Sequence, residues 1–342
     1  MRLPEARGPL TEELLGALRQ PAGSVQLFGA GLAFDPPAAA LADDDLQLGL
    51  WTCYELHYAG FTDARPGWEW DPELMAWTKA LEARFRSALR SCVPAMAMLP
   101  GESIADRLRA LIDADTGPQL ARHLQADATA EEFREFVTHR SIYHLKEADP
   151  HSWAIPRLRG KAKAALVEIQ SDEYGAGSVS RMHSELFRAT MRGLGLDDSY
   201  GYYLNQAPGV TLAISNLMSF FGLHRENLGA LAGHLAAFEM TSSAPNRRYG
   251  KGLRRLGADA VTTRFYDEHV TADALHEQLA AHDVCGSLVA EEPELADDVL
   301  FGAACALHLD NLFAGHLLRS WASGSSSLRT AGSTAALTAG LS

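Results

Sequence analysis

The chain has 342 residues, of which 47% are hydrophobic and 21% charged, and its formal net charge is −13. This composition is typical of a globular protein with a sizeable core and excludes a disordered chain. The negative charge disfavours proteins that coat nucleic acids or bind anionic membranes, so we expect no nucleic-acid partner.

The first 45 residues are predicted to form an N-terminal helical extension. Residues 1–20 are charged and helical in pattern, without the apolar region of a secretory leader, which favours a cytoplasmic protein. The best strand candidate of the whole chain is GSVQLFGAGLAF at 23–34. Its GAG triplet lacks the complete GxGxxG of a dinucleotide-binding turn. The segment DPPAAALADDD at 35–45 then leads into a capped helix start.

From residue 46 onward, apolar residues recur at helical spacing, while runs rich in Val, Ile and Thr are rare. Clusters of Pro, Gly and Asp separate the helices. We therefore predict an all-α fold, with a helical bundle domain at 46–322 and a flexible C-terminal tail at 323–342. The predicted helices cover residues 46–60, 71–91, 101–113, 129–146, 158–174, 179–194, 208–221, 225–243, 247–256, 259–282 and 291–321.

The most apolar long stretch, residues 299–318, predicts a buried core helix and no membrane span. His308, Asp310, Asn311 and His316 interrupt it, and such residues are costly inside a bilayer.

The four cysteines are widely spaced and form no CxxC pair. We interpret them as small buried hydrophobic residues of a reducing cytoplasm, and neither a disulfide framework nor a zinc site. They are Cys53, Cys92, Cys285 and Cys305.

Signatures of several enzyme classes are absent from the sequence. It contains no HExxH, no P-loop, no GxSxG and no Glu three residues before any histidine. Zincins and di-iron bundles of the ferritin type are therefore excluded by these tests.

The stretch FYDEHVTADALHEQLAAHD at 265–283 carries a stripe of candidate ligands. At 100° per residue, His269, Asp273 and His276 project from one narrow face of a helix. The spacing alone fits either a metal site or a solvated face.

A second candidate pair stands at two adjoining helices. Glu173 and His183 would lie on different faces of one continuous helix, but Gly175 and Gly177 permit a break that realigns them. The helix of His183 has an apolar face, so this histidine is either a satisfied core residue or a ligand.

Two further carboxylates complete the set of candidates. Glu239 falls inside an otherwise apolar helix, where a buried carboxylate needs a partner, and Glu147 ends a helix beside Pro150. Imidazole and carboxylate ligands suit iron or manganese. The alternatives are ion pairs of Glu147 with Lys146 or Arg157 and of Glu239 with Arg247 or Arg248, and surface charge for Glu173. His144, His151 and His234 fit as ligands equally well on spacing alone.

In this order of residues the chain resembles the haem-oxygenase-like di-iron oxidases, a family of iron-containing redox enzymes. The resemblance covers roughly residues 50 to 330 and rests on KEADPHSWAIPRL, EIQSDEYGAGSVSRMH, HLAAFEMTSSAPNRRYGKGLRRLG and FYDEHVTADALHEQ. It implies a haem-oxygenase-like bundle of seven core helices that binds two Fe²⁺ ions, with O₂ as co-substrate; a mixed Mn/Fe centre is also compatible.

The resemblance also implies the ligands, and Glu173 matches a carboxylate used by only some members. Carried over by motif, the metal ligands are Glu147, Glu173, His183, Glu239, His269, Asp273 and His276. Residues expected to support them by hydrogen bonds are Tyr143, His144, Asp172, Tyr174 and Asn246.

The implied function is a non-haem di-iron oxygenase or oxidase that oxidises a small organic substrate in specialised metabolism. The reaction would be N-oxygenation or an oxidative C–C cleavage or decarboxylation, and family precedent favours a homodimer. The alternatives are a haem-binding or haem-degrading protein with His183 or His144 as axial ligand, a hydrolase using His282 and Asp283, and a non-catalytic helical metal-binding module. A basic cluster either orients a substrate carboxylate or forms a solvated helix face; it comprises Arg247, Arg248, Lys251, Arg254 and Arg255.

Overall fold

The computed structural model describes residues 1–28, 36–98 and 101–330, with the side chains of residues 271–274 also outside the described part. The described residues form helices and contain no β-strand, which confirms the all-α prediction. The helices are α1 (Pro9–Leu18), α2 (Asp44–Glu55), α3 (Pro72–Cys92), α4 (Ile104–Asp113), α5 (Leu120–Ala126), α6 (Ala130–His144), α7 (Asp149–Ser152), α8 (Gly160–Glu173), α9 (His183–Gly193), α10 (Gly209–Leu223), α11 (Leu228–Arg255), α12 (Ala260–Gln278), the π-helix η7 (Leu279–Gly286), α13 (Ser287–Glu291) and α14 (Ala296–Ala322). Short 3-10 turns lie at Pro37–Leu41, Trp68–Trp70, Gly175–Gly177, Val179–Arg181, Leu204–Gln206, Arg225–Asn227 and Pro293–Leu295.

Helix starts follow the capping residues in the sequence. The side chains of Asp43, Asp71, Ser103 and Asp259 accept hydrogen bonds from backbone N–H groups of the first turns of α2, α3, α4 and α12. α6 starts with a full capping box at Thr129.

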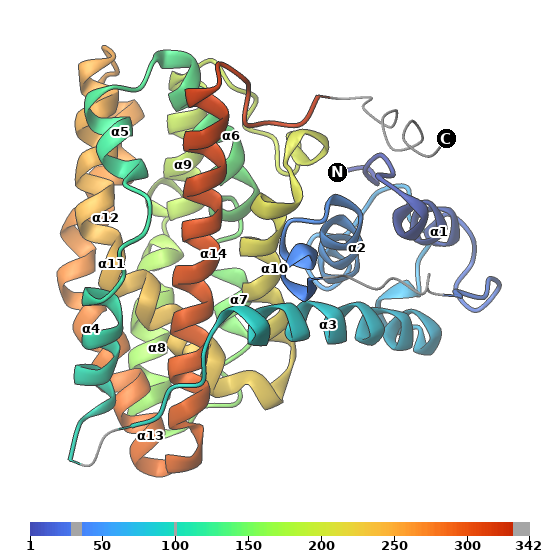
Figure 1. Cartoon of the computed structure of the whole chain (residues 1–342), viewed down its shortest axis with the longest axis horizontal. Helices are drawn as coiled ribbons and strands as arrows, with labels where there is room; N and C mark the ends of the chain where they lie inside the picture. Colours follow the sequence, from blue (N-terminus) through green and yellow to red (C-terminus); the bar gives the residue numbers. More distant parts are fainter. Residues whose placement is uncertain (29–35, 99–100, 331–342) are drawn as a thin grey trace.

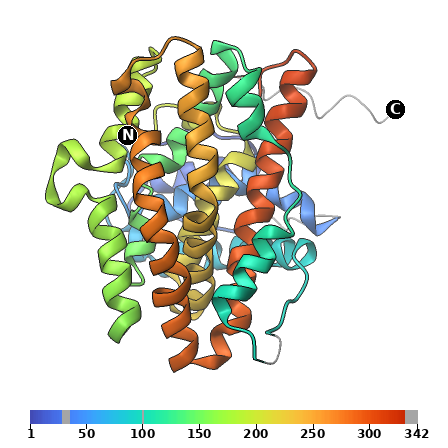
Figure 2. The same ribbon diagram turned by 90° about the vertical axis from the view of Figure 1, so that its left-hand side faces the viewer.

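The long helices α11, α12 and α14 run side by side and form the body of the bundle (Figures 1 and 2). α11 packs along both α12 and α14. At the α11–α14 crossing the backbones approach closely, because a Cβ on Gly233 would lie 1.8 Å from the carbonyl oxygen of Val299. A Cβ on Gly302 would likewise lie 1.9 Å from the oxygen of Ala230. Only glycine fits this crossing.

The N-terminal helices α1, α2 and α3 pack on one side of the bundle, with α3 crossing the direction of the long helices (Figure 1). The almost wholly buried α10 joins the two parts, since it contacts α2 as well as α6 and α14. Leu10 and Leu14 of α1 are fully buried in the same apolar cluster as the bundle core. The division of the chain at residue 46 stays a prediction.

Three differences from the predicted elements have physical causes. The helices predicted at 225–243 and 247–256 fall on one helix, α11, which begins at Leu228 after a 3-10 turn and continues through Pro245 because both halves are held by packing on neighbouring helices. α5 (Leu120–Ala126) is too short to show helical periodicity and was not predicted. The strand candidate is wrong for residues 23–28, which form no strand, while 29–34 lie outside the described residues.

Within the predicted flexible tail at 323–342, Ser327 and Arg329 are held against the rest of the chain. Ser327 is buried, and its hydroxyl bonds Glu135 at 2.6 Å and His139 at 3.0 Å. Arg329 donates its backbone N–H to the carbonyl of Gln206 and pairs with Asp44. Residues 331–342 lie outside the described residues.

α14 is a buried core helix, as predicted for 299–318, with Leu300, Phe313 and Leu317 shielded from solvent. In the described part of the chain, no helix has the length and apolar character needed to cross a membrane. All four cysteines are free thiols; Cys53, Cys285 and Cys305 are buried, whereas Cys92 is partly exposed, against the prediction.

Candidate metal centre

Five elements of the bundle supply the predicted ligands. Glu147 lies in the turn between α6 and α7, and Glu239 lies in the middle of α11. Glu173 is the last residue of α8, and His183 is the first residue of α9. α12 carries His269 and His276, with Asp273 between them. The side chain of Asp273 lies outside the described residues.

The break between α8 and α9 occurs where the glycines predicted it. Gly175 has φ +65°, and a Cβ there would lie 2.5 Å from the backbone nitrogen of Met182. The chain therefore turns back sharply, and Nδ1 of His183 comes to 2.8 Å from Oε2 of Glu173.

That close approach lacks hydrogen-bond geometry. Nδ1 of His183 and Oε2 of Glu173 are both buried and have no hydrogen-bond partner. Buried polar atoms without partners are costly. These two atoms lie close together but are not aligned for a hydrogen bond. This arrangement is the one expected of two ligand atoms that bind the same cation.

Two groups of side chains present donor atoms within 4.8 Å of one another. The first group contains Glu147, Glu173, His183 and His269. The second contains Glu173, Glu239 and His276, so Glu173 belongs to both. We call these residues together the ligand cluster. A carboxylate common to two groups is suited to bridge two metal ions.

The histidines on α12 are held in defined orientations. Nδ1 of His269 lies 2.9 Å from the carbonyl oxygen of Phe265, which directs Nε2 toward Glu147, 4.0 Å away. Nε2 of His276 lies 3.1 Å from Asp172, and Nδ1 then faces Oε2 of Glu239 at 3.4 Å. Imidazoles that bind metals usually donate their other N–H in this way.

Glu147 has two further partners. The hydroxyl of Tyr143 donates to Oε1 at 2.5 Å, and Nδ1 of His144 lies 3.1 Å from Oε2. Tyr143, His144 and Asp172 thus contact the ligand cluster as predicted. Tyr174 instead donates to Asp149 and lies 3.0 Å from the hydroxyl of Ser152.

The electrostatics of the cluster favour a cation. Burial and the charges of Glu147 and Glu239 raise the pKa of Glu173 against the opposing effect of His183. Burial works against protonation of His183, but Glu173 and the other carboxylates outweigh it and raise its pKa to about 9. In the same way the contact with Glu239 raises the pKa of His276 to about 9 against burial. The carboxylates of the cluster therefore favour bound positive charge, either as protons on the histidines or as metal ions.

The alternative ion pairs of Glu147 do not form. Lys146 binds Glu55, and Arg157 donates to backbone carbonyls, so neither is the partner of Glu147. His151 and His234 contact each other at 3.2 Å and belong to neither group of donors.

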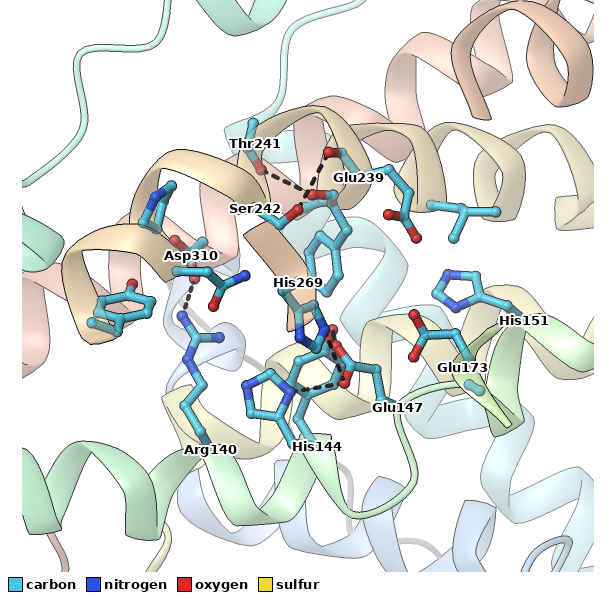
Figure 3. Close-up of a pocket in the computed structure, with 18 of the residues that line it drawn as sticks. Arg140, His144, Glu147, His151, Glu173, Glu239, Thr241, Ser242, His269 and Asp310 are labelled. Carbon is cyan, nitrogen blue, oxygen red and sulfur yellow. Dashed lines mark hydrogen bonds and ion pairs between the residues drawn. The ribbon is translucent and has the colours of Figure 1, made fainter. Parts of the chain in front are cut away.

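A cavity of about 140 Å³ adjoins the ligand cluster. Glu147, Glu173, Glu239 and His269 line one part of it, and Figure 3 shows Arg140 and Asp310 beyond them. No sequence pattern indicated a role for Arg140, because a single arginine in a helix is usually a surface residue. The centre thus has room for a reactant beside the donors.

Residues 134–311, just over half of the chain, match the sequence model of a family described as iron-containing redox enzyme. The chain belongs to this haem-oxygenase-like family of iron-containing redox enzymes. The matched segment contains the whole ligand cluster, but it is shorter than the resemblance at roughly 50 to 330 predicted.

The chain is similar to the nitrosourea synthase of Streptomyces achromogenes subsp. streptozoticus. It is 29% identical over 149 residues, which are 42% of this chain and 31% of the relative. The chain therefore corresponds to about a third of that protein. A solved structure, a domain of unknown function with a heme oxygenase-like fold from Shewanella denitrificans, is 15% identical with a TM-score of 0.49. That alignment covers 66% of this chain and 95% of the other.

The basic cluster of this iron-containing redox enzyme does not line the cavity. Arg254 pairs with Asp267 at the surface, and Arg255 donates to the carbonyls of Gln125 and Ala128. These contacts agree with a solvated helix face that interacts locally.

Proposed function

We propose that this iron-containing redox enzyme is a non-haem di-iron oxygenase or oxidase that acts on a small organic molecule in the cavity beside the ligand cluster. The single observation that carries the proposal is the sharing of Glu173 between two groups of buried and partly buried donors. A mixed Mn/Fe centre would use the same oxygen and nitrogen donors. A homodimer and a cytoplasmic location stay proposals from the sequence.

In this proposal Glu147, His183 and His269 hold one ion, Glu239 and His276 hold the other, and Glu173 reaches both. Asp273 is a further proposed ligand because of its place between the two histidines of α12. Two bound ferrous ions would supply the electrons for the reduction of O₂.

The chain's own residues define the surroundings of the reaction. Phe265 and Asp172 fix the two imidazoles of α12, and Tyr143 holds Glu147 through its hydroxyl. Leu235 and Phe238 of α11 provide apolar lining of the cavity, which limits water near the donors. The name of the nitrosourea synthase favours oxidation of nitrogen among the proposed reactions.

Metal stoichiometry tests this proposal. Protein loaded with Fe(II) without oxygen should bind about two equivalents and give a transient visible absorbance on exposure to O₂. Glu173→Ala should lose both ions, because both groups contain Glu173, whereas His276→Ala should lose mainly one. The matched control is His282→Ala, which removes an exposed histidine of the following π-helix and should leave two equivalents.

Other results would favour other functions. Binding of one equivalent or none by the native chain contradicts a di-iron centre. A Soret band with tight haem binding would favour the haem-binding alternative. Unchanged iron content in Glu173→Ala would show that the donors are assigned wrongly.

A further inference from the structure

The cavity beside the ligand cluster contains one buried guanidinium. The side chain of Arg140, on α6, is 11% exposed, and its Nη2 donates to Oδ1 of Asp310 at 2.7 Å. Its central carbon lies 4.6 Å from the ring centre of Phe313 and 5.6 Å from that of Phe136. Aromatic rings therefore surround the guanidinium, and its N–H groups are directed in a fixed plane.

The pair of Arg140 and Asp310 is unequal in burial. The carboxylate of Asp310 is 49% exposed, whereas the guanidinium is shielded. Solvent therefore screens the negative partner more than the positive one. Arginine has five N–H donors, and the contact with Asp310 uses the Nη2 end of the group. The guanidinium retains capacity to bind a second anion.

A second polar group of the cavity has no partner. Asn246 of α11 is 9% exposed and lines the cavity, and its side chain makes no hydrogen bond to any described residue. The amide atoms of Asn246 are not among the buried polar atoms that lack a partner, so they are accessible to a ligand or water in the cavity. Tyr249, one helical turn further along α11, lines the same part of the cavity. The ring centre of Tyr249 lies 4.8 Å from that of Phe136, the ring beside Arg140, so this part of α11 faces the Arg140 side of the cavity.

We propose that Arg140 binds a carboxylate of the substrate and that Asn246 donates a hydrogen bond to it. The substrate is then a small organic acid that enters with its carboxylate away from the ligand cluster. Arginine suits this role because its planar fork matches the two oxygens of a carboxylate. That the other end of the substrate reacts at the ligand cluster rests on the proposed function.

The orientation follows from the distribution of charge in the cavity. Glu147, Glu173 and Glu239 line one end of the cavity, and in the proposed function bound cations balance their charges. At the other end the shielded guanidinium of Arg140 offers directed N–H donors, while its partner Asp310 is half exposed to solvent, so a substrate carboxylate is favoured there. The far end of the acid then faces the donors. This arrangement favours oxidation at a site remote from the carboxylate over loss of the carboxylate itself.

Binding of two probes of equal chain length tests the proposal. Pentanoate and pentan-1-ol are titrated into the anaerobic Fe(II)-loaded protein and followed by calorimetry. The native chain should bind pentanoate about ten- to a hundredfold more tightly, as expected for a charge-assisted contact in a shielded site. Arg140→Gln should abolish this preference, and Arg140→Lys should retain part of it because the charge remains. Iron content and helicity, measured on each variant, should match the native chain.

The matched control is Arg254→Gln, which removes an arginine paired with an aspartate at the surface. It should leave the preference for pentanoate unchanged. A preference that persists in Arg140→Gln, or no pentanoate binding to the native chain, would overturn the proposal. A preference that disappears when iron is omitted would also overturn it, because the carboxylate would then bind the metal. If the chain binds no iron yet prefers pentanoate through Arg140, the carboxylate site stands and the di-iron function fails.

Discussion

A buried ion pair connects the N-terminal helices to the turn that carries Glu147. Glu55, at the end of α2, is fully buried, and its Oε2 accepts from Nζ of Lys146 at 2.9 Å. The hydroxyl of Tyr200 donates to the same oxygen at 2.7 Å. Because Lys146 directly precedes Glu147, this pair fixes the start of the ligand turn. We predict that it contributes strongly to stability.

Replacing Lys146 with Met removes the ammonium and leaves the carboxylate of Glu55 in the core with Tyr200 as its remaining partner. Loss of one partner from a buried pair costs about 3–5 kcal/mol. Most of this cost comes from the charge that stays buried without its cation, so Lys146→Met should destabilise the chain by about 3–5 kcal/mol.

Urea unfolding followed by circular dichroism measures this penalty. The double variant Lys146→Met/Glu55→Gln should recover most of the loss, because no charge then remains in the core. The matched control is Lys161→Met: Lys161 pairs with Asp283 at 2.6 Å, but its side chain is 66% exposed. Its loss should cost about 0.5 kcal/mol or less. A loss below about 1 kcal/mol in Lys146→Met, or no recovery in the double variant, would refute the reasoning.

Three other variants or measurements give further predictions. Gly233→Ala should destabilise the chain by about 3 kcal/mol or more in thermal unfolding, because its Cβ would overlap the backbone of Val299. In the control Gly16→Ala, the exposed helical position has nothing within 4 Å, so the chain should become more stable by up to about 1 kcal/mol. Burial lowers the pKa of His151 to about 4, so the unfolded chain takes up a proton below about pH 6.5 that the folded chain refuses. Stability should fall as the pH drops from about 6.5 to 4, and His151→Gln should show a shallower slope, whereas equal slopes would count against a buried neutral imidazole. Cys92, the partly exposed thiol, should react with a disulfide reagent in the folded chain before the three buried thiols do.

Much of the helical architecture could be predicted because apolar periodicity is a local property of the sequence. The limits of α12 at Ala260 and Gln278 lie close to the predicted 259–282. Local rules failed at Pro245, where the missing N–H and the ring predict a helix end. Packing of α11 on two long neighbours outweighs that local preference.

The ligand cluster was only partly predictable for a different reason. The stripe on α12 follows from spacing within one helix, and the turn at Gly175 follows from glycine chemistry. The meeting of Glu147, Glu173 and Glu239 depends on how the α6–α7 turn packs against α8 and α11, and residue spacing within one helix cannot predict that packing. Arg140 was missed because its partner, Asp310, is 170 residues away and belongs to the last long helix.

The protonation of the ligand cluster links its charge to metal binding. With pKa values of about 9, both His183 and His276 carry a proton at neutral pH when carboxylates are their only neighbours. Each imidazole must lose that proton before its nitrogen can bind a metal ion. Metal uptake should therefore release protons and become tighter as the pH rises from about 7 to 9. In the same pH range the metal-free fold loses the favourable contacts of the protonated imidazoles with Glu173 and Glu239, so its stability falls. The rise in pH therefore destabilises the metal-free chain and at the same time increases its affinity for the metal ions that replace the protons.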